Sequence, residues 1–170
     1  MQRESEQRSW WLALALVLFA LVFLLTLVRS RPPDPKPTDA PASAFSAARA
    51  RELLQQLVGD GTPHPVGSEA NAQVRERILA ALALLGYAPQ VQEAFVCSGF
   101  GTCATVKNIL ARLDGGEPSP VVRLSLTTPS ESRGAVMLSA HYDSVGAGPG
   151  ASDDGTGVVT VLETARALKL

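Results

Sequence analysis

Three side chains in the last third of the sequence have the types and the spacing of a metal or acid–base site. His141 and Asp143 are separated by one residue, and Asp153 follows after a glycine-rich loop. Residues i and i+2 of a strand point to one side, so His141 and Asp143 can approach each other. A carboxylate that accepts one imidazole N–H leaves the other ring nitrogen for a metal. Glycines let the loop fold sharply, so that Asp153 can join the same site.

The same residues also fit simpler interpretations. A glycine-rich loop can bind phosphate, but Thr156 stands where the Walker pattern requires Lys, and Asp153 and Asp154 would repel a phosphate. The loop could instead be a turn into a helix with one of these aspartates as its N-cap. His141 could be an ordinary core histidine. Residue chemistry alone therefore indicates only a candidate metal or acid–base site.

The segments around this site alternate between helix and strand patterns. Apolar spacing predicts a helix around Leu53–Val58, a second helix that Ser68 caps and Gly86 ends, and a third from about Gly155. The alternation of helices and strands indicates an α/β sandwich, in which ligands gather at the carboxyl ends of strands. The predicted strands are, in order, 90–96, 106–113, 122–126 and 135–140. An unbroken apolar run at 135–138 predicts that the last is central and buried on both faces.

A different kind of segment precedes this domain. Trp10–Val28 is a run of 19 residues without a charge, which predicts a transmembrane helix in contact with the lipid bilayer. The apolar core of a signal peptide, the main alternative, usually spans only about 7–15 residues. The polar residues 1–9 precede the helix, and a Pro-rich linker at 29–43 leads to the domain at 44–170. Two basic residues precede this helix and three follow it, so the positive-inside rule places the chain after the helix in the cytoplasm by one charge only. This difference is too small to set the orientation.

Composition excludes several classes of protein. Fifteen Lys and Arg balance sixteen Asp and Glu, for a net charge of −1, so we expect no nucleic-acid partner. Two cysteines are too few for a disulfide scaffold or a Cys-rich zinc finger. Cys97 and Cys103 could close a short loop as a disulfide if the domain lies in an oxidising compartment.

The stretch that begins at His141 resembles metallopeptidase family 28, the two-zinc aminopeptidases and their relatives. The family ends a central strand with His-x-Asp and places another Asp twelve residues after the His, in a Gly-x-x-Asp-Asp/Asn-Gly-x-Gly loop. Residues 150–157 read Gly-Ala-Ser-Asp-Asp-Gly-Thr-Gly, and Val-Leu-Glu follows at 161–163. Pro63–Ser68 with Asn71, and the segment 106–113, resemble earlier parts of the family pattern. The leading apolar helix makes the chain similar to the membrane-bound branch of the endoplasmic reticulum and vacuole.

This resemblance implies a fold, a cofactor and residue roles. The fold is a three-layer α/β sandwich with a mixed, mostly parallel sheet. His141 would be a zinc ligand, Asp153 would bridge two zinc ions, and Asp143 would orient the histidine. A metal-activated water would hydrolyse peptide substrates in a domain on the extracytoplasmic side, periplasmic or lumenal. The peptide bond between Asp153 and Asp154 is expected to be cis, as it often is in the family.

The family pattern also includes a Glu-Glu pair, a further acidic ligand and a second ligand His, which do not occur before Leu170. We therefore expect the chain to be the N-terminal half of a zinc exopeptidase, aminopeptidase-like, and inactive by itself. Two alternatives are a non-catalytic membrane interaction protein that reuses the fold and a one-zinc relative such as a glutaminyl cyclase. His64 is interpreted as a structural loop histidine, and Glu163 as a helix-surface partner of Arg166.

Overall fold

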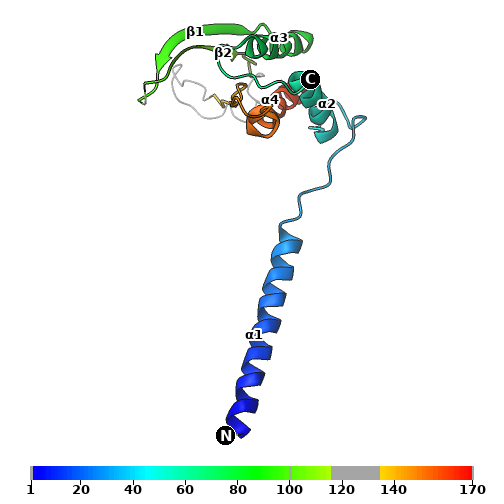
Figure 1. Cartoon of the computed structure of the whole chain (residues 1–170). Helices are drawn as coiled ribbons and strands as arrows, with labels where there is room; N and C mark the ends of the chain where they lie inside the picture. The colour runs from blue at the N-terminus through cyan, green and yellow to red at the C-terminus, as the bar shows by residue number, and fades with distance from the viewer. Residues whose placement is uncertain (1, 100, 116–134, 170) are drawn as a thin grey trace, which may run out of the picture. The chain divides into compact units, whose positions relative to one another are not determined.

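The computed structural model describes residues 2–99, 101–115 and 135–169, and it divides the chain into two units, Met1–Asp34 and Pro35–Leu170. The first unit contains one continuous helix, α1 (Gln2–Arg29) (Figure 1). Within it, the 20 residues Trp10–Arg29 have a mean hydropathy of 2.9, so this helix is long and apolar enough to cross a membrane. The predicted apolar helix at 10–28 is confirmed as a helix.

The second unit consists of helices and one β-hairpin (Figure 1). Its elements are α2 (Ala47–Val58), α3 (Glu69–Leu84), β1 (Gln90–Cys97), β2 (Cys103–Leu110), the π-helical turn η2 (Ala151–Gly155) and α4 (Thr156–Leu168). All three predicted helices are confirmed, as is the strand at 90–96. The second strand begins and ends three residues earlier than the predicted 106–113. The two strands pair antiparallel, from Gln90 opposite Leu110 to Cys97 opposite Cys103.

Helix boundaries follow local capping chemistry. Ser68 caps α3 through a bond from the Asn71 N–H to its hydroxyl, as predicted, and Ser46 caps α2 in the same way through Arg49 N–H. Gly86 follows α3 with φ of +74°, a conformation that costs glycine little. The Tyr87 N–H then bonds to the Leu82 carbonyl across the helix end. Short polar signals in the sequence therefore set where these helices begin and end.

The hydrophobic core of the second unit lies among its three helices. Each helix turns an apolar face inward, and the helical spacing seen in the sequence places these residues together. The buried core residues are Ala50, Leu57, Val74, Ile78, Leu82, Tyr87, Val158, Val159 and Leu162. This core holds the start of α4, and with it the glycine-rich loop, against α2 and α3.

The segment 135–140 differs from the prediction. No strand is assigned there, and the side chains of Val136 and Met137 are 91% and 85% exposed, so the expected burial on both faces is wrong. A strand obtains its hydrogen bonds and its burial from neighbouring strands. Among the described residues, the sheet has only the two strands β1 and β2. The strand predicted at 122–126 lies outside the described residues, and the mostly parallel sheet stays a prediction.

A polar cluster, formed by Ser46, Arg49, Glu163 and Arg166, fixes the second half of the Pro-rich linker on the domain. Glu163 accepts hydrogen bonds from the Ser46 N–H, Arg49 and Arg166, and its side chain is only 4% exposed. The partnership with Arg166 is confirmed, but Glu163 is buried and not on the helix surface. The two arginines donate to backbone carbonyls of the linker at Thr38, Ala40, Ala42 and Ala44. Residues 38–44 therefore do not behave as a free spacer.

The end of the β-hairpin is closed by a covalent link. Cys97, the last residue of β1, pairs with Cys103, the first residue of β2, and their sulfurs are bonded. These are the two cysteines of the sequence, and because they are bonded to each other, neither is a free thiol.

Candidate metal site

The structure brings the three predicted site residues together. His141 Nε2 lies 3.0 Å from Asp153 Oδ1, although twelve residues separate the two in sequence. On the other side of the ring, Nδ1 lies 3.1 Å from the backbone carbonyl oxygen of Asp143 and 3.4 Å from its carboxylate Oδ1. One imidazole nitrogen therefore faces Asp153 while Asp143 fixes the other.

The electrostatics of this group favour a charged histidine. Partial burial lowers the pKa of His141, but the hydrogen bond to Asp153, the Asp143 carbonyl and both carboxylates raise it more, so its net pKa is raised above the usual 6.5. Two carboxylates beside one imidazole attract a positive charge at that point. A proton on the imidazole or a divalent cation at Nε2 would supply such a charge.

The glycine-rich loop folds as its sequence requires. Gly150 has φ of +65°, and a Cβ placed there would lie 2.8 Å from the Ser144 Cβ, so a larger residue has neither the conformation nor the space. The Gly155 N–H closes the turn by bonding to the Gly150 carbonyl at 2.8 Å. The peptide bond between Asp153 and Asp154 is cis, as expected.

Asp153 and Asp154 have different roles. The Asp154 Oδ1 accepts the Gly157 N–H at 3.1 Å and thereby caps the first turn of α4. The Asp153 side chain is 89% exposed and turns instead toward His141, which is 51% exposed. Of the two aspartates that the sequence left open as N-caps, Asp154 is the one whose side chain bonds to the first turn of α4, and Asp153 faces His141.

The donor atoms fit a zinc ion. Two ligands at about 2.0–2.1 Å from a tetrahedral zinc lie about 3.3 Å apart. The 3.0 Å separation of His141 Nε2 and Asp153 Oδ1 is close to that value. Over residues 2–99, 101–115 and 135–169, no group of three or more His, Cys, Asp or Glu side chains is arranged to hold a metal. The described residues therefore place two candidate donors, His141 and Asp153, beside each other, with the Asp143 carboxylate next to the ring.

A buried junction supports the loop from below. The His64 N–H donates to Ser144 Oγ at 2.7 Å, the Ser144 N–H donates to the His64 carbonyl at 3.2 Å, and Asn71 Nδ2 donates to the same carbonyl. His64, Asn71 and Ser144 are each at most 5% exposed. His64 is therefore structural, as interpreted. Ser144 was missed by the sequence analysis, because a serine next to Asp143 gives no signal of a partner 80 residues away.

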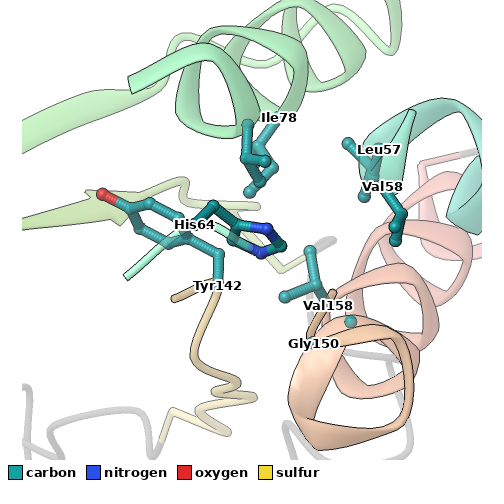
Figure 2. A pocket seen from close by; sticks show the side chains of 9 residues that line it. Leu57, Val58, His64, Ile78, Tyr142, Gly150 and Val158 are labelled. Carbon is teal, nitrogen blue, oxygen red and sulfur yellow. The ribbon is translucent and has the colours of Figure 1, made fainter. Parts of the chain in front are cut away.

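The His64 ring lines a small cavity. Figure 2 shows this ring pointing in among apolar side chains of α2, α3 and α4, with Gly150 beside it. The cavity has a volume of about 10 Å³ and is lined by Leu57, Val58, His64, Val74, Ile78, Tyr142, Gly150, Gly155 and Val158. This volume is about that of a single water molecule's probe sphere, so the cavity is too small for a substrate.

Comparison with known proteins shows which family the chain is similar to. Residues 121–170 match the sequence model of peptidase family M28. The chain is 30% identical over 161 residues to a vacuolar membrane protease of Coprinopsis cinerea, an alignment that covers 89% of this chain and 15% of the relative. It is 34% identical over 165 residues to a vacuolar membrane protease of Phaeosphaeria nodorum, covering 86% and 17%. The chain thus spans only about a sixth of the length of these relatives.

Among solved structures, the fold is similar to that of a glutaminyl cyclase from Porphyromonas gingivalis. The TM-score is 0.56 at 30% sequence identity, and the match covers 74% of this chain and 40% of that one. A second structure of glutaminyl cyclase from the same organism matches with a TM-score of 0.54 at 28% identity.

Proposed function

The chain matches peptidase family M28 over residues 121–170 and resembles membrane proteases over most of its length, and on this premise we propose that it forms part of a membrane-anchored, zinc-dependent exopeptidase. The single observation that carries the proposal is the approach of His141 to Asp153, with Asp143 behind the ring. Such a pair, a ligand histidine fixed by a carboxylate on its other nitrogen, is typical of zinc sites.

The residues of this chain have separate tasks in that reaction. His141 and Asp153 would hold zinc, and the Asp143 carbonyl and carboxylate keep the Nδ1 proton in place so that Nε2 faces the metal. When bound, zinc acts as a Lewis acid and makes water acidic enough to attack a peptide carbonyl near neutral pH. The 89% exposure of the Asp153 side chain leaves room for a second metal ion and for a substrate.

The anchor is the second part of the proposal. The relatives named above are membrane proteases, and Trp10–Arg29 passes the length and hydropathy criteria for a span. We assign this helix to the lipid bilayer and the domain to the extracytoplasmic side, periplasmic or lumenal. The Cys97–Cys103 disulfide supports that side, because disulfides persist mainly in oxidising compartments.

Zinc titration of the purified protein tests the metal site directly. Wild type should bind zinc, whereas His141→Ala and Asp153→Asn should weaken the affinity at least about tenfold, and Asp143→Asn should weaken it about 10–100-fold through the misplaced imidazole. Asp114→Asn is the matched control, because this carboxylate is 81% exposed and pairs with Arg112 away from the site. Equal affinities in all five proteins would refute the assignment.

The glutaminyl cyclase structures favour a second candidate reaction. In it, the amino group of an N-terminal glutamine attacks its own side-chain amide and releases ammonia, without addition of water. Incubation of the zinc-loaded protein with an aminoacyl amide and with an N-terminal glutaminyl peptide separates the two candidates. A free amino acid supports the exopeptidase, and ammonia with a cyclised peptide supports the cyclase. Because this chain by itself is expected to be inactive, only the appearance of one of the two products decides between the candidates.

A further inference from the structure

We propose that Ser144 and Asn71 are positioning residues for the zinc ligands, which they hold at binding distance through the buried backbone of His64. This inference rests on the proposed function, because it assigns a task toward the zinc site. Neither Ser144 nor Asn71 is a candidate zinc ligand, so the zinc chemistry alone assigns them no role. The junction of His64, Asn71 and Ser144 is buried, while the side chains of His141 and Asp153 are exposed.

The first end of the loop is fixed by four hydrogen bonds. Ser144 directly follows Asp143, and it exchanges two bonds with His64, through its hydroxyl at 2.7 Å and its N–H at 3.2 Å. The Ser144 hydroxyl in turn donates to the Val145 carbonyl at 3.0 Å. Asn71, near the start of α3, donates to the His64 carbonyl at 3.2 Å. The position of Asp143 is thereby tied to a helix of the core.

The second end of the loop rests on the same junction. Gly150 packs so closely that an added Cβ would meet the Ser144 Cβ at 2.8 Å and His64 Nε2 at 3.3 Å. Asp153 follows three residues later, within the turn that the bond from Gly155 N–H to the Gly150 carbonyl closes. The two ends of the segment between His141 and Asp153 therefore both contact the buried junction, through Ser144 and through Gly150.

The junction has the properties of a support that determines geometry. Its polar groups are buried, so each lost bond leaves a donor or acceptor that water reaches poorly. The two zinc ligands, by contrast, are 51% and 89% exposed and have little packing of their own to hold them. The positions of these ligands therefore depend on the backbone that carries them. The junction of His64, Asn71 and Ser144 is where the two ends of that backbone segment meet the core.

The test compares Ser144→Ala with Tyr87→Phe, each in the full chain. Tyr87 donates its hydroxyl to the Ala165 carbonyl at 2.8 Å, at the other end of α4, so Tyr87→Phe removes one partly buried hydrogen bond and leaves the junction intact. Ser144→Ala removes both bonds of its hydroxyl, with the His64 N–H and the Val145 carbonyl. Zinc affinity and thermal unfolding are measured for both variants, together with the hydrogen exchange of the Gly155 amide. Ser144→Ala should weaken zinc binding about 10–100-fold, while Tyr87→Phe should change it less than about twofold at a similar loss of stability.

The other outcomes are equally defined. Unchanged zinc binding in Ser144→Ala, or an equal weakening in both variants, would overturn the inference and leave the junction with a role in stability alone. If Ser144→Ala does not fold, Asn71→Ala, which removes a single bond to the His64 carbonyl, takes its place with the same two readings. If wild type binds no zinc, the proposed function fails, and the hydrogen exchange of the Gly155 amide tests the inference. Faster exchange in Ser144→Ala but not in Tyr87→Phe would support the positioning of the loop. Unchanged exchange in Ser144→Ala would refute it.

Discussion

Replacement of the buried Glu163 by glutamine is the sharpest test of how the domain is held together. Glu163 Oε1 accepts hydrogen bonds from the Ser46 N–H at 2.9 Å and from Arg49 Nε at 3.0 Å, and Oε2 accepts one from Arg166 Nε at 2.7 Å. Glutamine keeps the shape and Oε1, but it places an N–H₂ opposite the Arg166 donor and removes the only negative charge of the cluster.

The size of the effect follows from burial. Loss of one partner of a buried ion pair costs about 3–5 kcal/mol. The side chains of both arginines are 20% exposed, so water can partly solvate the charges that Glu163→Gln leaves behind. We therefore expect the free energy of unfolding to fall by about 2 kcal/mol. The exposed Glu52, on the outer face of α2, provides the matched control, and Glu52→Gln should cost less than about 0.5 kcal/mol.

Urea unfolding of the whole chain in detergent, followed by the near-ultraviolet circular dichroism of Tyr87 and Tyr142, measures this difference. Both tyrosines belong to the second unit, whereas the two tryptophans, Trp10 and Trp11, lie in α1. Both tryptophans are therefore replaced by phenylalanine in every variant, so that the tyrosine signal follows the second unit. The midpoint should shift without a change in the slope, since the surface exposed on unfolding is nearly the same. A cost for Glu163→Gln no larger than that for Glu52→Gln would refute the reasoning, because the cluster would then give no net stabilisation.

The same carboxylate predicts a dependence on pH. Burial raises the pKa of Glu163, but hydrogen bonds from Arg166, the Ser46 N–H and Arg49 lower it more, so its net pKa lies below the usual 4.5. The unfolded chain then binds the proton more readily than the folded chain does. This part of the stability is fully present above pH 4.5 and is lost as the pH falls through the lowered pKa. Glu163→Gln should show no such loss.

Three further predictions concern the linker, the loop and the hairpin. Arg49→Lys keeps the charge but loses the fork that reaches the Thr38, Ala40 and Ala44 carbonyls, so proteinase K should cut residues 38–44 several-fold faster than in wild type; an unchanged rate would mean that the linker is held without it. In Gly157→Ala, the new Cβ would overlap the Asp154 carboxylate that caps α4, so we expect a loss of about 1 kcal/mol or more in urea unfolding, whereas Gly146→Ala, with open space around it, is the control and should be nearly neutral. Replacing Cys97 and Cys103 together by serine removes the cross-link of a short loop. Hydrogen-exchange protection of β1 and β2 should then fall by about 2 kcal/mol, while protection in α4 stays unchanged. An equal loss of protection in both regions would contradict a local role of the disulfide.

The local elements of the domain could be predicted because their causes lie within a few residues. Apolar spacing around Leu53–Val58 and between Ser68 and Gly86, with the serine at position 68, suffices for two helices and a cap. The family pattern identified His141, Asp143 and Asp153. The strand at 135–140 shows the limit of this reasoning. Its apolar run favours burial, but burial depends on which neighbours are present, and Val136 and Met137 have none among the described residues.

The sequence by itself therefore determined the apolar N-terminal helix, the three helices of the domain with the Ser68 cap, and the identity of the candidate ligands, since these depend on local propensity, on capping and on residue chemistry. Only the tertiary structure decided that Glu163 is buried between Arg49 and Arg166, that Asp154 caps α4 while Asp153 faces His141, and that Ser144 meets His64. The burial of Glu163 and the meeting of Ser144 with His64 join segments 80 or more residues apart. Such contacts arise when helices pack and exclude water, and no short stretch of sequence records which distant partner a polar side chain will find.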